Sequence, residues 1–162
     1  MTAGWVAGTV RARAMARRVL GTDAARQLAD SPSLSGAQRM LQATPFHGVA
    51  EPGLSLAAAQ HAVAETILWD LRVLAGWLPR EGVSMLRLLA GWFEIANVDE
   101  LLQGLAGRPI GAEFELGALA TAWPRLSEAG SSAELRHLLT ASVWGDPGGA
   151  TNRDIRAGMR AR

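Results

Sequence analysis

A phrase of seven residues occurs twice in this chain, and it constrains the fold more than any other feature. Leu71–Trp77 reads Leu-Arg-Val-Leu-Ala-Gly-Trp, and Leu86–Trp92 repeats it fifteen positions later with leucine in place of valine. The connecting Leu78–Gly82 contains a proline, which cannot continue a helix, and a glycine, which suits a turn. The two copies are therefore predicted to lie on two helices that fold back on each other as an antiparallel hairpin.

Both helices of this hairpin are apolar on more than one side. The first helix has one face of Val63, Ile67, Leu71, Leu74 and Leu78, and Trp69, Val73 and Trp77 cover its other side. The second helix has the faces Leu86/Leu89/Phe93 and Leu88/Trp92/Ile95, and its thin polar stripe is chiefly Arg87 and Glu94. Because a helix that is apolar nearly all round is surrounded by protein, the hairpin over 54–105 is predicted to be the core.

The rest of the chain also has the pattern of helices joined by short breaks. Periodicity, breaking residues and capping-box spacings predict helices over 5–20, 23–29, 35–43, 54–78, 83–105, 113–123, 131–143 and from 152 onward. Ser35 and Ser131 are expected to open capping boxes, and Pro124 is expected to stop the helix before it. Since no stretch alternates with period two, the predicted fold is all-α, a bundle of repeated helical units around the central hairpin.

A weak internal repeat appears when the sequence is shifted by 98 positions. Leu41–Phe46 then aligns with Leu139–Trp144, and both read Leu-x-Ala-Thr/Ser-x-aromatic (139 − 41 = 98). The repeat predicts a first helical unit over 1–111 and the start of a second, incomplete unit over 112–162. A repeat unit without half its core is not stable alone. The last part of the chain is therefore expected either to rest on the first unit or to belong to a longer protein.

Composition excludes several classes of protein. Apolar residues make up 49% of the chain and charged residues 19%, which is typical of a folded domain and not of a disordered one. There is no cysteine, so disulfides and thiolate metal sites are impossible. No uncharged apolar run reaches the roughly 18 to 20 residues of a membrane span, and the first residues do not resemble a signal peptide. The expected location is the cytoplasm, with a peripheral membrane partner left open.

Charge is spread unevenly, although the net charge is only +1. Residues 1–40 hold an excess of arginine over aspartate, and residues 94–115 hold an excess of acids. Such an arrangement suits a docking surface, but it is too mild to indicate nucleic-acid binding by itself. An arginine-rich nucleic-acid-binding domain is therefore a less favoured alternative.

Motifs for catalysis are absent from the sequence. There is no phosphate-binding loop, dinucleotide fingerprint, nucleophile elbow or zinc-protease motif. His47, His61 and His137 lie on separate elements without metal-ligand spacing. The adjacent carboxylates Asp99 and Glu100 would point about 100° apart on a helix, and we interpret them as a solvated helix surface. No catalytic residue, cofactor or metal is expected, and the protein is not predicted to be an enzyme.

Three polar residues are candidates for partner contact. Asn97 shares a face with Leu86 and Phe93, where a buried amide needs hydrogen-bond partners. It would either satisfy a neighbouring helix end or loop backbone, or take part in recognition. Arg11 and Arg13 flank the apolar face of the first helix, from which they would either extend to solvent or meet an acidic partner.

Several motifs follow one another in a recognisable order: Thr9–Met15 in the first helix, Leu28–Leu34 and Leu41–Phe46 after it, and Phe93–Asp99 in the second hairpin helix. Their order and spacing resemble those of the C/d subunit family of V-type and archaeal-type rotary ATPases. Thr9–Met15 is similar to that family's opening "aromatic … A-R-x-R-A-M" helix. The next two segments resemble its "L-x-x-a-x-s-L … L-x-x-T-P-Y" stretch, with phenylalanine in place of tyrosine, and the last resembles its "D-I-x-N-L-K" segment, with Asp99 in place of the lysine. The resemblance covers roughly residues 5–102.

The resemblance implies a non-catalytic role. Members of the family are all-helical, consist of three similar units and form a funnel-shaped cap on the membrane rotor ring. They receive the foot of the central stalk and transmit torque for ion transport or ATP synthesis. It implies rotor-ring and central-stalk subunits as partners, and a cytoplasmic location with membrane association through the complex. Arg11, Arg13 and Asn97 are then the candidate partner contacts, and a generic helical interaction scaffold is the alternative.

Overall fold

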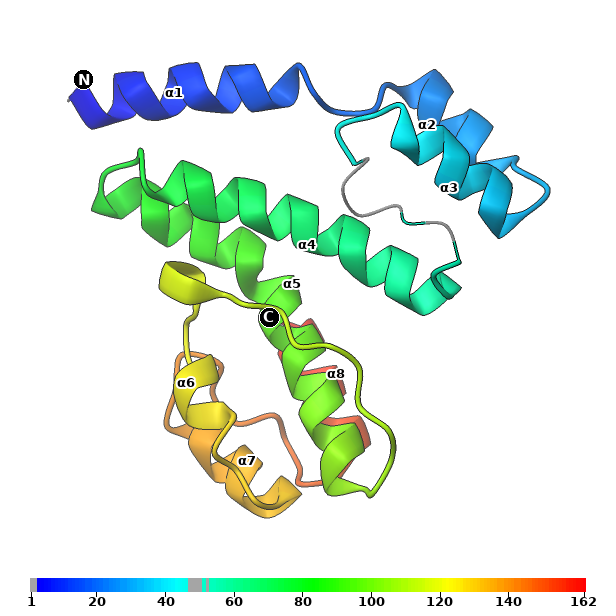
Figure 1. Ribbon diagram of the computed structural model, residues 1–162. Coiled ribbons are helices and arrows are strands. Elements are labelled where there is room, and N and C mark those ends of the chain that lie inside the picture. The colour runs from blue at the N-terminus through cyan, green and yellow to red at the C-terminus, as the bar shows by residue number, and fades with distance from the viewer. Residues whose placement is uncertain (1–2, 47–50, 52) are drawn as a thin grey trace. The chain divides into compact units, whose positions relative to one another are not determined.

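The structure is a computed structural model that describes residues 3–46, 51 and 53–162. Over these residues the chain forms helices and no strand, which confirms the predicted all-α class (Figure 1). The elements are α1 (Ala3–Ala16), α2 (Thr22–Ala29), α3 (Leu34–Gln42), α4 (Leu56–Ala75), α5 (Arg80–Leu105), a 3₁₀ turn (Gly117–Leu119), α6 (Trp123–Leu126), α7 (Ser132–Thr140) and α8 (Asn152–Arg160).

The chain divides into two compact units, Met1–Gly82 and Val83–Arg162. The division falls near the start of α5, whereas the sequence places the end of its first repeat unit after Gly111. The two boundaries differ because most of α5 makes its long-range hydrogen bonds with residues that follow it, such as Phe114 and Thr121.

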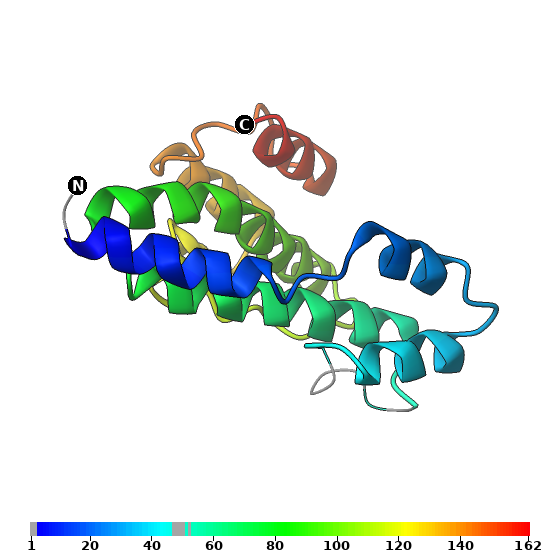
Figure 2. The same cartoon turned by 90° about the horizontal axis from the view of Figure 1, so that it is seen from above.

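In the first unit α1 lies along α4, as two perpendicular views show (Figures 1 and 2). Gly8 is the buried residue of α1, and a Cβ atom placed on it would lie 2.3 Å from Cδ2 of Leu78. Glycine at this position therefore permits the close approach of α1 to the residues after α4. The pair α2 and α3 is tied to the start of α4 because Gln38 donates a hydrogen bond to the Leu54 carbonyl oxygen (3.1 Å).

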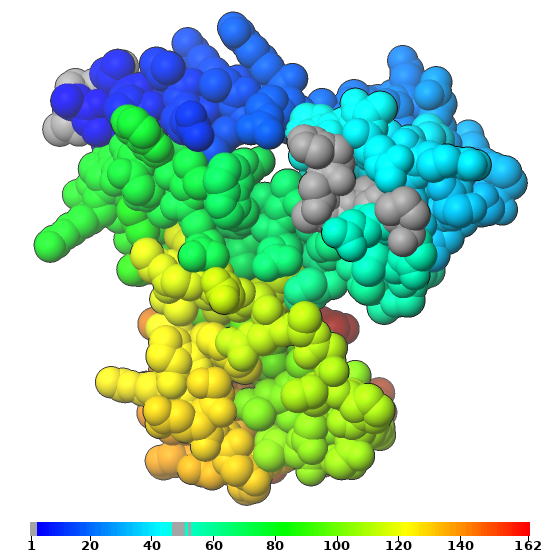
Figure 3. Space-filling view, viewed as in Figure 1, coloured from blue at the N-terminus to red at the C-terminus, as the bar shows by residue number. Residues whose placement is uncertain are grey.

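The second unit contains most of the buried apolar side chains of the described chain. Those of the first unit are Leu41, Ala59 and Leu68, whereas α5, the loop that follows it, α6, α7 and α8 contribute all the others. On the face seen in Figure 3, the yellow and orange residues that follow α5 lie directly against the yellow-green end of that helix. A hydrophobic core large enough to support a domain is therefore present within 83–162.

The prediction that the hairpin helices are buried on all sides is wrong. Trp77 is 51% exposed, Leu88 80% and Trp92 66%. On α5 Leu86, Ala90 and Ile95 are buried, whereas Leu88, Leu89 and Trp92 are exposed, so each predicted apolar face is only partly covered. Apolar residues all round a helix indicate burial, but they do not show which other segments cover each face.

The helix predicted over 113–123 is also absent. Residues 108–116 have no regular secondary structure, the 3₁₀ turn follows, and α6 begins at Trp123 with Pro124 in its first turn. A proline is well tolerated there, because the first turn of a helix does not need its N–H groups for hydrogen bonds within the helix. Pro124 therefore starts a helix where the sequence analysis expected it to stop one.

Helix starts differ in detail from the predicted capping boxes. The N-cap of α3 is Ser33, whose hydroxyl accepts a hydrogen bond from the Gly36 N–H (3.1 Å), so the box predicted at Ser35 is wrong. Ser131 caps α7 as expected, although the Glu134 carboxylate accepts from Gly130 and not from Ser131. The complete capping box lies at the start of α8, between Thr151 and Asp154.

The segments aligned by the 98-residue shift end in the same hydrogen-bonded geometry. Thr44 Oγ1 donates to the Leu41 carbonyl oxygen (2.6 Å) and accepts from the Phe46 N–H (3.1 Å). Ser142 Oγ donates to the Leu139 carbonyl oxygen (2.7 Å) and accepts from the Trp144 N–H (3.1 Å). The repeat itself stays a prediction, and this shared geometry supports it.

The bounds of the two helices are related by the same shift. Leu34–Gln42 of α3 becomes Ser132–Thr140 of α7 when 98 is added to each number, and the capping serines correspond as well (33 + 98 = 131). In each unit the helix also contacts the helix before it, α2 in the first and α6 in the second. The two units therefore share a pair of contacting helices, α2/α3 and α6/α7, and the second helix of each pair begins and ends at positions that differ by 98.

An exposed ion pair ties α7 to the loop before α8. Arg136 Nε and one terminal nitrogen each lie 3.0 Å from an oxygen of the Asp146 carboxylate, and the Gly148 N–H donates to the same group. The hydrogen bond from Arg136, followed by the one from Gly148, lowers the pKa of Asp146 below its ordinary value.

Replacing Asp146 by asparagine is expected to change how stability depends on acid. The pKa of Asp146 is lower in the folded than in the unfolded chain, so its contribution is present above about pH 4 and is lost as the pH falls through the folded-state value. The wild-type chain should be slightly more stable than D146N near neutral pH, and the difference should vanish at lower pH. Thermal unfolding followed by circular dichroism from about pH 2 to pH 7 tests this, and a pH-independent difference would contradict it.

Candidate protein-interaction surface

Four apolar side chains form an exposed stripe on the first half of α5. Met85, Leu88, Leu89 and Trp92 are 64%, 80%, 60% and 66% exposed, and their spacing places them on one side of the helix. We call this set the apolar stripe. Contiguous exposed apolar surface on a folded protein marks a site of protein or membrane interaction. The apolar stripe is therefore the candidate functional surface of the second unit.

A buried carboxylate holds the opposite side of α5. Glu94 is 1% exposed, and it accepts hydrogen bonds from the Thr121 N–H (2.7 Å), the Ala122 N–H (2.8 Å) and the Trp144 indole Nε1–H (2.7 Å). No ion pair of Glu94 is formed within the described chain, so N–H dipoles alone stabilise its charge. Glu94 thereby joins α5 to the start of α6 and to the residues after α7.

Trp144 also lies against α5 itself. A Cβ atom on Gly91 would be 3.4 Å from Cη2 of the Trp144 ring, so the indole contacts the helix backbone next to Trp92. Trp144 thus supports α5 on the flank between the apolar stripe and Glu94. A supported backbone presents the stripe in one orientation, which lowers the entropic cost of binding a partner.

Asn97 continues this support one turn further along α5. It is 1% exposed, its Nδ2 donates to the Phe114 carbonyl oxygen (2.9 Å), and its Oδ1 accepts from the Phe114 N–H (2.8 Å). The Phe114 ring packs edge-on against Phe93, with centroids 5.1 Å apart. Of the two roles left open for Asn97, the structure shows the contact with a neighbouring loop backbone. In this structure the side chain is not accessible to a partner.

Arg11 and Arg13 lie elsewhere, on α1 of the first unit. Both residues are exposed. Two positions along a helix correspond to a rotation of about 200°, so the two side chains leave α1 in different directions. Neither belongs to the apolar stripe, and their contact with a partner stays a prediction.

The interpretation of Asp99 and Glu100 as a solvated surface is wrong. Asp99 binds Arg156 through Oδ1 (2.7 Å) and Arg160 through Oδ2 (2.8 Å), which fixes α8 to α5. Glu100 accepts a hydrogen bond from the Gly111 N–H in the loop that follows α5. The two carboxylates point apart, as expected, but each one has its own structural partner.

Two carboxylates line a cavity beside this loop. The cavity has a volume of about 230 Å³ and is lined in part by Glu100 and Glu113. The Glu113 carboxylate accepts a hydrogen bond from the Trp123 indole, so both carboxylates bind N–H groups of the chain. Among the described residues no three His, Cys, Asp or Glu side chains could together hold a metal ion, and His47 lies outside those residues.

Sequence reasoning missed Glu94 and Trp144, which matter most for this surface. Glu94 was placed in a polar stripe, yet it follows Leu86 and Ala90 at intervals of four and so shares their buried face. That spacing was the available signal. No local pattern identifies Trp144 as its partner, because the two residues are 50 positions apart.

Neither similarity to known proteins nor a membrane-spanning helix indicates a function for this chain. No family model, curated protein or solved structure matches this chain. Each helix in the described part of the chain is too short or too polar to cross a lipid bilayer. Function is therefore inferred from the residues themselves and from the resemblance of their motifs.

Replacing Glu94 by alanine is expected to destabilise the second unit by about 3 kcal/mol. The change leaves three N–H groups without their acceptor, and each buried unpaired donor costs about 1–3 kcal/mol. Denaturant unfolding measures the loss, and faster hydrogen exchange at Thr121 and Ala122 would locate it. The matched change Glu128→Ala removes an exposed carboxylate and should alter stability by less than about 0.5 kcal/mol. Equal effects of the two substitutions would contradict the assigned role of Glu94.

Proposed function

We propose that this chain is a non-catalytic connector subunit of a rotary V/A-type ATPase. In this role it links the membrane rotor ring to the central shaft and transmits torque for ion transport or ATP synthesis. The proposal starts from the order of motifs in Thr9–Met15, Leu28–Phe46 and Phe93–Asp99, which resembles that of the C/d subunit family. Its location would be cytoplasmic, with membrane association through the complex.

The observation that best supports the proposal is the matched pair α3 and α7. Both helices have a serine N-cap, both end on a hydroxyl that bonds to a leucine carbonyl oxygen, and their bounds differ by 98 residues throughout. A chain with two similar helical units is what the resemblance to a family of repeated units implies. Unrelated helices would not be expected to share the cap, the length and the ending.

The apolar stripe supports a role in assembly. A torque-transmitting subunit has to make firm contacts with other proteins, and large exposed apolar side chains provide such contacts. Behind the stripe, Glu94 and Asn97 join α5 to later segments with short hydrogen bonds. Arg11 and Arg13 on α1 are then available for polar contacts with an acidic partner.

A generic helical interaction scaffold is the second candidate. The same apolar stripe favours it, because an exposed apolar face indicates a protein partner without identifying it. The two candidates differ in which proteins bind, so identification of the partners separates them.

Affinity capture from the native host is expected to recover rotor-ring and central-stalk subunits with the tagged chain. The variant Leu88→Gln/Trp92→Gln should capture several-fold less of them, because it places polar groups in the apolar stripe. The control Ile110→Gln/Val143→Gln changes two exposed apolar residues outside the stripe and should capture as much as the wild type. Recovery of other proteins and no ATPase subunits would instead identify a scaffold.

Replacing Arg11 and Arg13 together by alanine should lower the captured amount of these subunits, with a larger effect at low ionic strength. Contacts between exposed charges are screened over about 10 Å at 0.1 M salt, so an electrostatic contribution fades as salt is added. The pair Arg17→Ala/Arg18→Ala changes the same number of exposed charges just after the helix and serves as the control. Unchanged capture by the Arg11/Arg13 variant would remove these residues from the interface.

A further inference from the structure

An arginine-lined cavity in the second unit is not used by the proposed connector role. It has a volume of about 470 Å³, which lies in the range of small-molecule sites. Its lining residues are Arg108, Asn152, Arg153, Arg156, Ala157 and Arg160, so four of the six carry a guanidinium group. Apart from Arg108 in the loop after α5, all of them come from α8.

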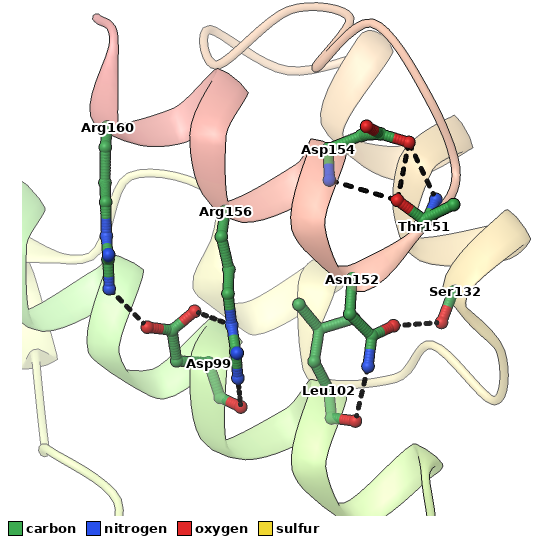
Figure 4. A network of polar contacts seen from close by, with 8 residues as sticks. All are labelled: Asp99, Leu102, Ser132, Thr151, Asn152, Asp154, Arg156 and Arg160. Carbon is green, nitrogen blue, oxygen red and sulfur yellow. Dashed lines mark hydrogen bonds and ion pairs between the residues drawn. The ribbon is translucent and has the colours of Figure 1, made fainter.

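No carboxylate lines the cavity, and one carboxylate outside the lining forms ion pairs with two of its arginines. Asp99 binds Arg156 and Arg160 from the side of α5, as Figure 4 shows. Within the described residues, Arg108 and Arg153 form no ion pair. The four arginines and Asp99 together carry a net charge of +3 (4 − 1 = 3). The other carboxylate of α8, that of Asp154, accepts hydrogen bonds from the N–H and the hydroxyl of Thr151, the N-cap residue.

The arginines bound to Asp99 still have hydrogen-bond donors to offer. A guanidinium carries five N–H donors. Arg156 uses its Nε and one terminal nitrogen for the Asp99 carboxylate and carbonyl oxygens, and Arg160 uses one terminal nitrogen. The remaining N–H groups can bind oxygen atoms of a ligand, while Asp99 holds both side chains in place.

The first turn of α8 is also held in place. Asn152 Nδ2 donates to the Leu102 carbonyl oxygen (3.3 Å), and its Oδ1 accepts from the Ser132 hydroxyl (3.1 Å) (Figure 4). Asn152 thus joins α8 to both α5 and α7, and its amide serves to position the helix. The arginines of α8 therefore extend from a backbone that is fixed before any ligand binds, which favours affinity.

We propose that this cavity binds a small polyphosphate, namely an inorganic triphosphate or the phosphate chain of a nucleotide. Planar guanidinium groups match the spacing of phosphoryl oxygens and bind them through paired hydrogen bonds. A single carboxylate would neutralise only part of the +3 excess, whereas a chain of phosphates carries several charges in a small volume. The proposal concerns the second unit alone and does not depend on the connector role.

Isothermal titration of the full chain with sodium tripolyphosphate, ATP and inorganic phosphate tests the proposal. Tripolyphosphate should bind saturably at one site per chain. Inorganic phosphate makes fewer charged contacts, so its affinity should be lower by a factor of about ten or more. If ATP binds as tightly as tripolyphosphate, the cavity also binds a phosphate chain that is attached to a nucleoside. If ATP binds much more weakly, the site is specific for inorganic polyphosphate.

Paired variants show whether the cavity is the binding site. Arg108→Gln/Arg153→Gln removes two arginines that make no internal ion pair, so the fold should persist, and tripolyphosphate affinity should fall about tenfold or more. Arg39→Gln/Arg125→Gln removes two exposed arginines elsewhere and should change affinity less than about twofold. Circular dichroism checks that both variants are folded.

Three results would overturn the proposal. The first is the absence of saturable tripolyphosphate binding by the wild-type chain. The second is an equal loss of affinity in both paired variants, which would indicate general attraction to a basic chain. The third is binding to phosphatidylcholine vesicles that contain phosphatidylinositol bisphosphate without binding to tripolyphosphate, which would assign the arginines to a lipid surface.

Discussion

The buried carboxylate of Glu94 is the interaction on which the second unit depends. Removing a charge from water is costly unless hydrogen bonds replace its hydration, and Glu94 obtains three of them from N–H groups at 2.7–2.8 Å. The donors come from two separate segments, at Thr121–Ala122 and at Trp144. A single side chain therefore determines how the residues on both sides of α7 meet α5.

Other polar residues of α5 extend the same arrangement along the helix. Asn97 pairs with both backbone groups of Phe114, and Asp99 binds two arginines of α8. Apolar burial supplies most of the driving force for folding, but it has no direction. These directional contacts select which segment lies at which turn of α5. As a result the opposite face, with the apolar stripe, is left without cover within the second unit.

Sequence reasoning succeeded where the controlling interactions are local. The bounds of α2, α3 and α7 follow from periodicity and from residues that break helices, and those helices are found within a few residues of the predicted ranges. It failed at 113–123, because a proline is compatible with the end of one helix and with the first turn of the next. It also failed for the tryptophans: Trp123 is buried and Trp92 is exposed, since burial depends on which distant segment covers a face.

The candidate surface was only partly predictable for the same reason. Leu88 and Trp92 were placed on one apolar face of α5 and Leu89 on another, and both faces were expected to be covered. Glu94 and Asn97 were placed on the correct helix, while their partners lie 17 to 50 positions away in the sequence. Spacing along a helix shows which residues share a face, and it contains no information on the donors that will approach that face.

The two matched helix endings have a consequence for how aromatic residues are used. In both, a hydroxyl fixes the backbone of the aromatic residue that follows, through bonds that need no distant partner. Phe46 and Trp144 are therefore placed by the same local rule, but only the indole has an N–H to donate. A phenylalanine at this position leaves the helix ending with local hydrogen bonds only. A tryptophan can add a hydrogen bond to a helix far away in the sequence, as Trp144 does with Glu94.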